Sequence, residues 1–120
     1  MMTAEEARKL AIHGAKILDA KKGRDIVIID ISAKASFADY FVIASASNER
    51  LLGALADDVD EGYAKENLFL KGCEGRKESG WILLDFGDII VNLFSEEMRQ
   101  RYNIEKVWGD CETVEFQEGN

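Results

Sequence analysis

The sequence contains no proline and no serine-rich stretch, although it is 120 residues long. Linkers between domains are typically rich in proline, glycine or polar residues, so this absence predicts one domain around one hydrophobic core. We expect the domain to span residues 1–112 and residues 113–120 to form a short acidic tail. Apolar residues make up 47% of the chain and charged residues 32%, which is the balance of a folded globular protein.

Long apolar runs are also missing. No run approaches the roughly 20 residues that a membrane-spanning helix needs. The first residues, MMTAEEARKLAIHG, are polar and acidic rather than those of a signal peptide. The sequence therefore predicts a cytoplasmic protein without a membrane partner.

Cysteine and histidine are scarce, which limits metal and nucleophile chemistry. Cys73 and Cys111 lie far apart, and neither has a second thiol two residues away. We therefore expect two free thiols rather than a disulfide or a metal pair. His13 is the only histidine, so a zinc site would have to recruit both distant cysteines, and no serine or cysteine lies near it in the sequence. These residues predict no catalytic group, no metal site and no cofactor.

Positive charge is in deficit as well. The chain has 23 acidic and 15 basic residues, which give a formal net charge of -8. Such a charge repels phosphate backbones and anionic lipid. We therefore expect no direct nucleic-acid readout, and we expect a macromolecular partner to be basic.

What the sequence does contain is an alternation of helix and strand patterns. Thr3 and Glu6 have the spacing of a capping box before a helix that ends near Gly23, and Ser47 or Asn48 can cap a second helix. A short helix is predicted at residues 96–102, a loop at 71–80 and an irregular end at 104–116. β-branched and aromatic runs predict strands at residues 25–31, 39–43, 68–70, 81–86 and 89–94. This order predicts an α/β fold, a mixed β-sheet with flanking helices.

The stretch GWILLDFGDIIVNLF at residues 80–94 holds the most informative candidates. Gly87 and Asp88 separate its two strands, which predicts an antiparallel hairpin whose tight turn is flanked by aspartates. Alternation places Trp81, Leu83 and Asp85 on one face of the first strand, and the residues between them on the other face, as core. Periodicity alone is equally consistent with two roles for the Trp81 side. It can be core beneath a helix, or a partner interface in which tryptophan is an anchor.

Carboxylates at strand ends leave an enzymatic alternative open. Asp85 and Asp88, with Asp30 and Asp39 around the turn at residues 32–37, are oxygen ligands suited to magnesium in a metal-dependent nucleotidyltransferase-like enzyme. Such an enzyme also needs a glycine-serine or Walker-type phosphate-binding turn near a strand end, and the sequence has none. Acidic residues beside turns usually serve local hydrogen bonds, so we favour a structural role over a metal site.

Four segments and one residue pair then carry a resemblance to a known family. They are DIVIIDIS at residues 25–32, SFADYFVI at 36–43, the pair Glu74-Gly75, GWILLDFGD at 80–88 and RQRYNIEKVWGD at 99–110. In order and spacing they resemble the ribosomal silencing factor family, also called RsfS or Iojap. The resemblance extends over nearly the whole chain, from the first helix to Asp110.

The resemblance implies a nucleotidyltransferase-like fold without transferase activity, and a homodimer when the protein is free. It also implies repression of translation during nutrient limitation, by binding a basic protein on the intersubunit face of the large ribosomal subunit and blocking the joining of the small subunit. We assign the partner contacts to Trp81 and Leu83 through apolar area, and to Asp85 and Asp88 through charge. Asn92 stands where the family usually has histidine, so no role of that histidine is carried over to it.

Overall fold

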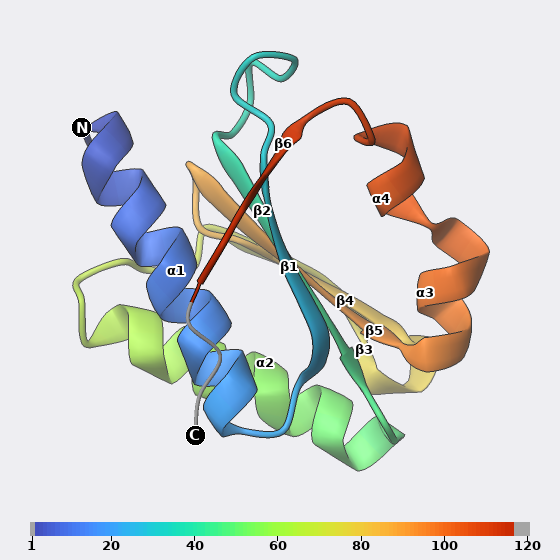
Figure 1. The fold of residues 1–120 in the computed structure, drawn as a ribbon. Coiled ribbons are helices and arrows are strands. Elements are labelled where there is room, and N and C mark those ends of the chain that lie inside the picture. Colours follow the sequence, from blue (N-terminus) through green and yellow to red (C-terminus); the bar gives the residue numbers. More distant parts are fainter. Residues whose placement is uncertain (1, 117–120) are drawn as a thin grey trace.

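The computed structural model describes residues 2–116, which form one mixed sheet between two layers of helices (Figure 1). The strands lie in the order β3-β4-β5-β2-β1-β6, where β2 runs parallel to β5 and every other neighbouring pair is antiparallel. The strands are β1 Arg24–Asp30, β2 Tyr40–Ala46, β3 Gly72–Arg76, β4 Trp81–Asp85, β5 Ile89–Ser95 and β6 Glu112–Val114. The helices are α1 Ala4–Ala20, α2 Glu49–Ala64, α3 Glu96–Tyr102 and α4 Ile104–Val107, with a 3-10 turn at Lys77–Ser79. The predicted α/β class with a mixed sheet is confirmed.

Both long helices begin where the sequence predicts. The Thr3 hydroxyl accepts from the Glu6 backbone N–H (3.1 Å), while the Glu6 carboxylate accepts from the Thr3 N–H (2.9 Å), which completes the capping box of α1. Asn48 caps α2, and its Oδ1 accepts from the Leu51 N–H (2.8 Å). These bonds satisfy backbone donors that the first turn of a helix leaves unpaired.

The helices α1, on the left of Figure 1, and α2, along its bottom, cover one face of the sheet and bury the larger hydrophobic cluster. The two helices pack closely at Gly14, because a Cβ at this position would overlap the Tyr63 hydroxyl. That hydroxyl donates to the Leu10 carbonyl (2.7 Å). Burial raises the pKa of Tyr63, so the phenol stays neutral and keeps this bond at physiological pH.

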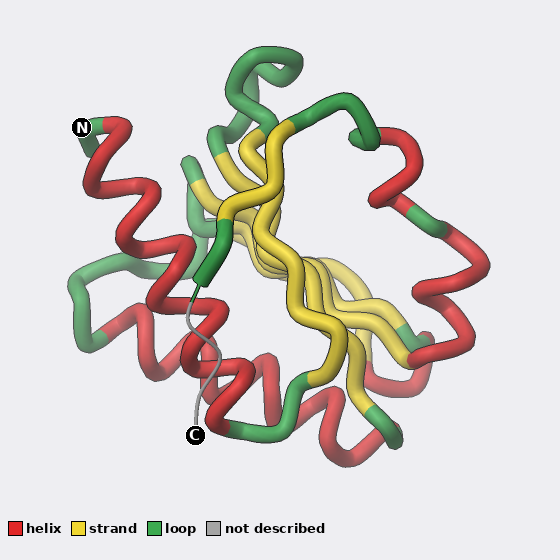
Figure 2. Tube along the Cα trace, in the orientation of Figure 1, coloured by secondary structure: helices red, strands yellow, loops and turns green. Residues whose placement is uncertain are grey.

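The helices α3 and α4 cover the other face, on the right of Figure 1. They have 7 and 4 residues, against 17 and 16 in α1 and α2, and Figure 2 shows the difference in length. A smaller hydrophobic cluster lies beneath them and is bordered by partly buried side chains, which include Trp81, Leu83 and Trp108. The side of the sheet that carries the predicted site is therefore only partly covered.

Two predictions for the segment between α2 and β4 are wrong. Residues 68–70 form no strand, and Leu68 packs into the larger core instead. The predicted loop at 71–80 contains β3, an edge strand whose residues are all exposed and which pairs antiparallel with β4. A short edge strand with no buried face lacks the apolar alternation on which the prediction relied.

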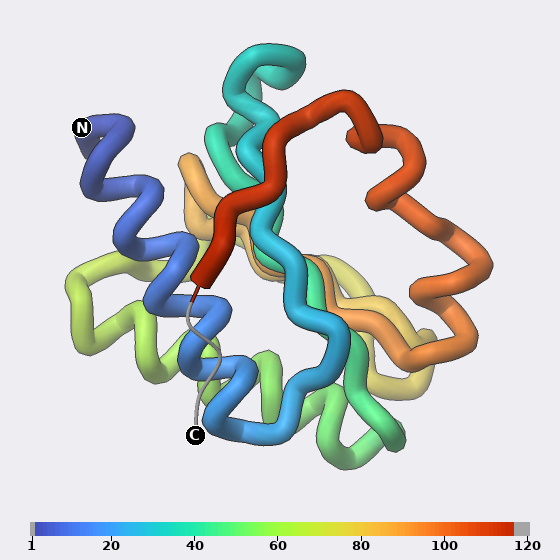
Figure 3. The backbone as a smooth tube through the Cα atoms, in the orientation of Figure 1, coloured from blue at the N-terminus to red at the C-terminus, as the bar shows by residue number. Residues whose placement is uncertain are grey.

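The predicted irregular end is wrong as well. Residues 104–107 form α4, and β6 pairs with β1 at the edge of the sheet opposite β3, where Figure 3 shows the red segment beside the light-blue one. The strand β6 crosses the boundary that we placed after residue 112, and Val114 is buried in the larger core. Residues 113 and 114 of the expected tail are thus part of the sheet, and residues 117–120 lie outside the described residues.

Candidate protein-binding face

Alternation along β4 determines on which side of the sheet each predicted site residue lies. Ile82 and Leu84 are buried in the cluster beneath α1 and α2, whereas Trp81, Leu83 and Asp85 are partly buried on the opposite side. The strands β4 and β5 pair as an antiparallel hairpin. Both predictions for this stretch, the hairpin and the face of each residue, are confirmed.

Trp81 is held by neighbours on several sides. Its ring stacks on Phe94, with centroids 5.0 Å apart and planes inclined by 28°, and lies against Tyr102 at 4.6 Å and 45°. Its indole N–H donates to Oδ1 of Asn92 (3.0 Å). Part of the ring is nevertheless exposed. A partly exposed aromatic ring that is already ordered loses little conformational entropy when it meets a partner.

A cavity of 240 Å³ opens beside the Trp81 ring. Apolar side chains and one carboxylate contribute to its lining, and we call these residues the Trp81 face: Glu74, Trp81, Leu83, Met98 and Tyr102. Glu74 of β3 is directly paired with Leu83 of β4, so the two side chains lie on the same side of the sheet. Pockets for drug-sized ligands measure about 300–1,000 Å³, so this smaller cavity suits a side chain of a partner protein better than a metabolite.

The two aspartates of the hairpin both support its turn. The Asp85 carboxylate accepts from the Gly87 N–H (2.8 Å), and Gly87 has a φ of 94°, which glycine adopts without strain. The Asp88 carbonyl accepts from the N–H groups of Asp39 (2.8 Å) and Tyr40 (3.0 Å) and ties the turn to the start of β2. Asp85 thus has a structural role in the free protein, and the pairing of either carboxylate with a partner stays a prediction.

Other carboxylates gather near this turn. Burial and the nearby charges of Asp88 and Asp30 raise the pKa of Asp39. The Asp30 carboxylate already accepts from the backbone N–H (3.0 Å) and the hydroxyl (2.6 Å) of Ser32. Within residues 2–116, no three histidine, cysteine or carboxylate side chains are placed to hold a metal ion. The four aspartates of the enzymatic alternative therefore do not form one metal-binding group in this part of the chain.

A second aromatic group, absent from our sequence predictions, belongs to the same sheet face. Phe41 and Trp108 meet edge to face with centroids 5.3 Å apart, and Phe37 lies 6.3 and 6.4 Å from them. Phe37 is 59% exposed. Lys34 stands 6.0 Å from the Trp108 ring centre, and its ammonium pairs with Asp110 (2.7 Å). These contacts join residues far apart in the sequence, which periodicity does not reveal.

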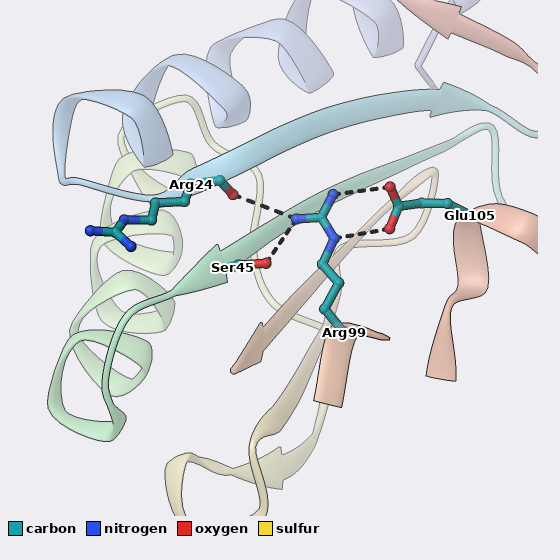
Figure 4. A network of polar contacts seen from close by, with 4 residues as sticks. All are labelled: Arg24, Ser45, Arg99 and Glu105. Atoms are coloured by element: carbon teal, nitrogen blue, oxygen red, sulfur yellow. Dashed lines mark hydrogen bonds and ion pairs between the residues drawn. The ribbon is translucent and has the colours of Figure 1, made fainter. Parts of the chain in front are cut away.

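Arg99 links both short helices to the sheet (Figure 4). Its Nε and Nη2 donate to the two carboxylate oxygens of Glu105 (2.9 and 3.1 Å), which joins α3 to α4. Its Nη1 donates to Oγ of Ser45 (3.0 Å) in β2 and to the carbonyl of Arg24 (3.5 Å) in β1. The rigid fork of arginine matches a carboxylate in this bidentate geometry. No local pattern in the sequence predicts this network, which holds α3, and with it Tyr102, against the sheet.

The scarce cysteine and histidine residues take no part in the Trp81 face. His13 lies against the Tyr63 ring between α1 and α2, with centroids 6.2 Å apart. Cys73 is exposed on β3, Cys111 is partly buried, and both are free thiols. None of the helices in residues 2–116 combines the length and the apolar composition that a membrane crossing requires.

The fold and the face together define a class: an α/β protein with two long helices on one side of a mixed sheet and a partly open aromatic face on the other. The model of the family described as "Ribosomal silencing factor during starvation" matches residues 4–120. The chain therefore belongs to the ribosomal silencing factor family, and the resemblance seen in the sequence is confirmed.

Individual proteins agree with this assignment. A Halalkalibacterium halodurans protein named ribosomal silencing factor RsfS is 31% identical over 116 residues, which cover 97% of each chain. The crystal structure of a Chromobacterium violaceum protein matches with a TM-score of 0.79 at 30% identity, over 98% of this chain and 95% of the other. A mouse protein named mitochondrial assembly of ribosomal large subunit protein 1 is 30% identical over 96 residues, 77% of this chain and 42% of its own length.

Proposed function

We propose that this protein represses translation in the cytoplasm under nutrient limitation. In this proposal it binds the large ribosomal subunit and sterically blocks the joining of the small subunit. Membership of the ribosomal silencing factor family supports the proposal, and the name of the mouse relative refers to the same subunit. The block needs no chemical step, because a folded domain at the subunit interface excludes whatever would pack there.

The docking partner in this proposal is a basic protein on the intersubunit face of the large subunit. The net charge of -8 disfavours docking on ribosomal RNA and favours a surface rich in lysine and arginine. The observation that carries the proposal is the Trp81 face, with its ordered aromatic ring, its apolar cavity and the Glu74 carboxylate. Aromatic anchors surrounded by polar groups are typical of the centre of protein interfaces.

The same proposal includes a homodimer in the absence of ribosomes. Phe37, Tyr102 and Val107 are 59%, 47% and 66% exposed, so they offer apolar area that a second copy can bury. Sedimentation equilibrium of the purified protein measures its mass in solution. A dimer mass is expected, and a monomer at the concentrations of the binding experiments would contradict this part of the proposal.

Co-sedimentation with purified ribosomal subunits tests the partner directly. The protein is mixed separately with large and with small subunits, and each mixture is sedimented through a sucrose cushion. We expect the protein in the large-subunit pellet alone, with recovery that saturates as the protein concentration rises. Recovery from neither pellet, or equal recovery from both, would count against the proposed function.

A further inference from the structure

Asn92 is a buried polar side chain in apolar surroundings. It is 1% exposed on β5, where pairing with the neighbouring strands places it between Leu83 of β4 and Ile43 of β2. Ile90 and Phe94, which flank it on the same side of β5, belong to the smaller hydrophobic cluster. An amide in such a place lowers folding stability unless its polar atoms find partners.

The Asn92 amide is satisfied at one end only. Its Oδ1 accepts the indole N–H of Trp81 at 3.0 Å. Its Nδ2 has no hydrogen-bond partner, and within residues 2–116 it is the one buried side-chain nitrogen or oxygen in that state. The indole nitrogen can only donate, so the amide must turn Oδ1 toward Trp81, and Nδ2 then points where no acceptor lies. The core thus holds an unpaired donor, Asn92 Nδ2, beside the acceptor Oδ1 that Trp81 uses.

That acceptor determines the orientation of the Trp81 ring. Stacking on Phe94 and contact with Tyr102 hold the ring in place, but ring contacts tolerate several orientations, whereas a hydrogen bond is directional. The bond turns the N–H edge of the indole toward β5. The ring held in this way lines the cavity together with Glu74 of β3.

We propose that Asn92 is a positioning residue for partner binding, because its Oδ1 holds the Trp81 indole in the one orientation that the partner meets. This inference rests on the proposed function, in which Trp81 contacts the large ribosomal subunit. Asn92 is buried and acts through Trp81 rather than by touching the partner. A side chain that is ordered before binding loses little conformational entropy when the complex forms. In the free protein, the unsatisfied Asn92 Nδ2 lowers the folding stability in exchange.

Two substitutions of similar size separate this role from a merely structural one. Asn92→Leu removes both the acceptor and the unsatisfied donor, whereas Asn92→Asp keeps an acceptor oxygen in either protonation state. In co-sedimentation with purified large ribosomal subunits, we expect Asn92→Leu to bind about tenfold more weakly, a part of the loss that truncating an anchor causes. Its melting temperature should stay the same or rise, because the unsatisfied donor is gone. Asn92→Asp should bind within about twofold of the wild type, since the acceptor is retained.

The indole N–H signal of Trp81 in NMR spectra reports the ring orientation in the free protein, and Trp81→Phe identifies that signal. We expect slow hydrogen exchange of this N–H in the wild type and in Asn92→Asp, and a shifted, faster-exchanging signal in Asn92→Leu. A leucine variant that keeps wild-type binding or a protected indole signal would overturn the inference, as would a parallel loss of binding and melting temperature. If the wild type does not bind large subunits, the proposed function and this inference fail together. If the wild type binds large subunits and Asn92→Leu binds them equally well, the inference fails and the proposed function stands.

Discussion

Trp81 contributes to the folded sheet and to the exposed surface at once. Its ring packs on Phe94 and bonds to Asn92, yet it remains partly open beside a cavity. Core and interface, the two roles that periodicity left open, are therefore not exclusive at this position. A substitution of Trp81 is expected to change stability and binding by separate amounts, and both have to be measured.

Trp81→Ala should weaken binding to the large subunit by at least ~2 kcal/mol, as truncation of an interface anchor does. It should also lower the free energy of unfolding by roughly 1–3 kcal/mol, because it removes a packed ring and leaves the whole Asn92 amide unsatisfied. Urea unfolding gives the stability change, and co-sedimentation at a temperature where the variant is folded gives the change in affinity.

Phe69→Ala is the matched control for Trp81→Ala. Phe69 is a 61% exposed aromatic residue in the segment before β3 and is not part of the Trp81 face. The Phe69→Ala variant is expected to bind the large subunit like the wild type. Wild-type binding by Trp81→Ala, or an equal loss in both variants, would show that the contact surface lies elsewhere on the protein.

Asp39 is expected to lower stability at neutral pH. Because burial and the charges of Asp88 and Asp30 raise its pKa, the native state holds the Asp39 proton more tightly than the unfolded chain does. The free energy of unfolding therefore falls as the pH rises from the usual aspartate range through the raised pKa. Asp39→Asn should raise stability at pH 7 by about 0.5 kcal/mol, the scale of charge interactions at partly exposed sites. Urea unfolding at acidic and neutral pH measures this, and an asparagine variant less stable than the wild type at pH 7 would refute it.

Alternation could assign Trp81, Leu83 and Asp85 to one side of β4 because the two-residue period of a strand does not depend on the rest of the fold. It could not identify Asn92 as the partner of Trp81, since that contact depends on the register between β4 and β5 and on the rotamers of both side chains. The one signal in the sequence is a single polar residue within the apolar run IIVNLF. Such a residue predicts a buried hydrogen bond but does not name its partner.

The short helices α3 and α4 depend on tertiary contacts for their stability. Isolated helices below about 12–15 residues are marginal in water, and these have 7 and 4 residues. Met98 and Ile104 pack on the smaller hydrophobic cluster, and Arg99 bonds to Glu105 and Ser45. Arg99 is therefore expected to fix the position of α3 on the sheet, and with it the positions of Met98 and Tyr102 in the Trp81 face.

Arg99→Lys should lower the free energy of unfolding by about 1–3 kcal/mol, because a lysine keeps the charge but cannot bond to Glu105 and Ser45 together. It should also speed the hydrogen exchange of the α3 amides. Arg101→Lys is the matched control on the same helix, where Arg101 is exposed, and it should change stability by less than about 0.5 kcal/mol. Equally small effects of the two substitutions would rule out this role for Arg99.

Elements with local signals were predictable, and the two edge strands were not. The capping residues Thr3 and Asn48 act within one helical turn, so both helix starts could be read from the sequence. The strand β3 has the sequence GCEGR and no buried residue, and β6 has only 3 residues. Their extended conformation comes from pairing with β4 and β1, which is information that a local pattern does not contain.

At the scale of the whole molecule, the order of the strands could not be predicted from the sequence. The strands β2 and β5 are parallel neighbours in the sheet, but α2, β3 and β4 separate them along the chain. The net charge, in contrast, could be counted directly. The order of the strands brings β4 next to the edge of the sheet, where the Trp81 face is only partly covered by α3. An acidic protein with such a surface is expected to meet its partner through both charge and apolar contact.

Binding to the large subunit should weaken as the salt concentration rises. A charge of -8 facing a basic surface is screened as the Debye length falls from about 10 Å at 0.1 M to about 3 Å at 1 M ionic strength. Co-sedimentation over a series of salt concentrations measures the dependence. The same affinity at low and high salt would exclude a largely electrostatic contact.

Subunit joining, followed by light scattering, tests the proposed translational block most directly. Purified large subunits are incubated with increasing amounts of the protein before small subunits are added. We expect the rise in scattering to shrink with dose and to vanish when the large subunits are saturated, and we expect Trp81→Ala to require a higher dose in proportion to its weaker binding. Unchanged joining at a several-fold excess over ribosomes, with the protein demonstrably bound to the large subunits in the same sample, would contradict the proposal that this protein silences ribosomes by blocking subunit association.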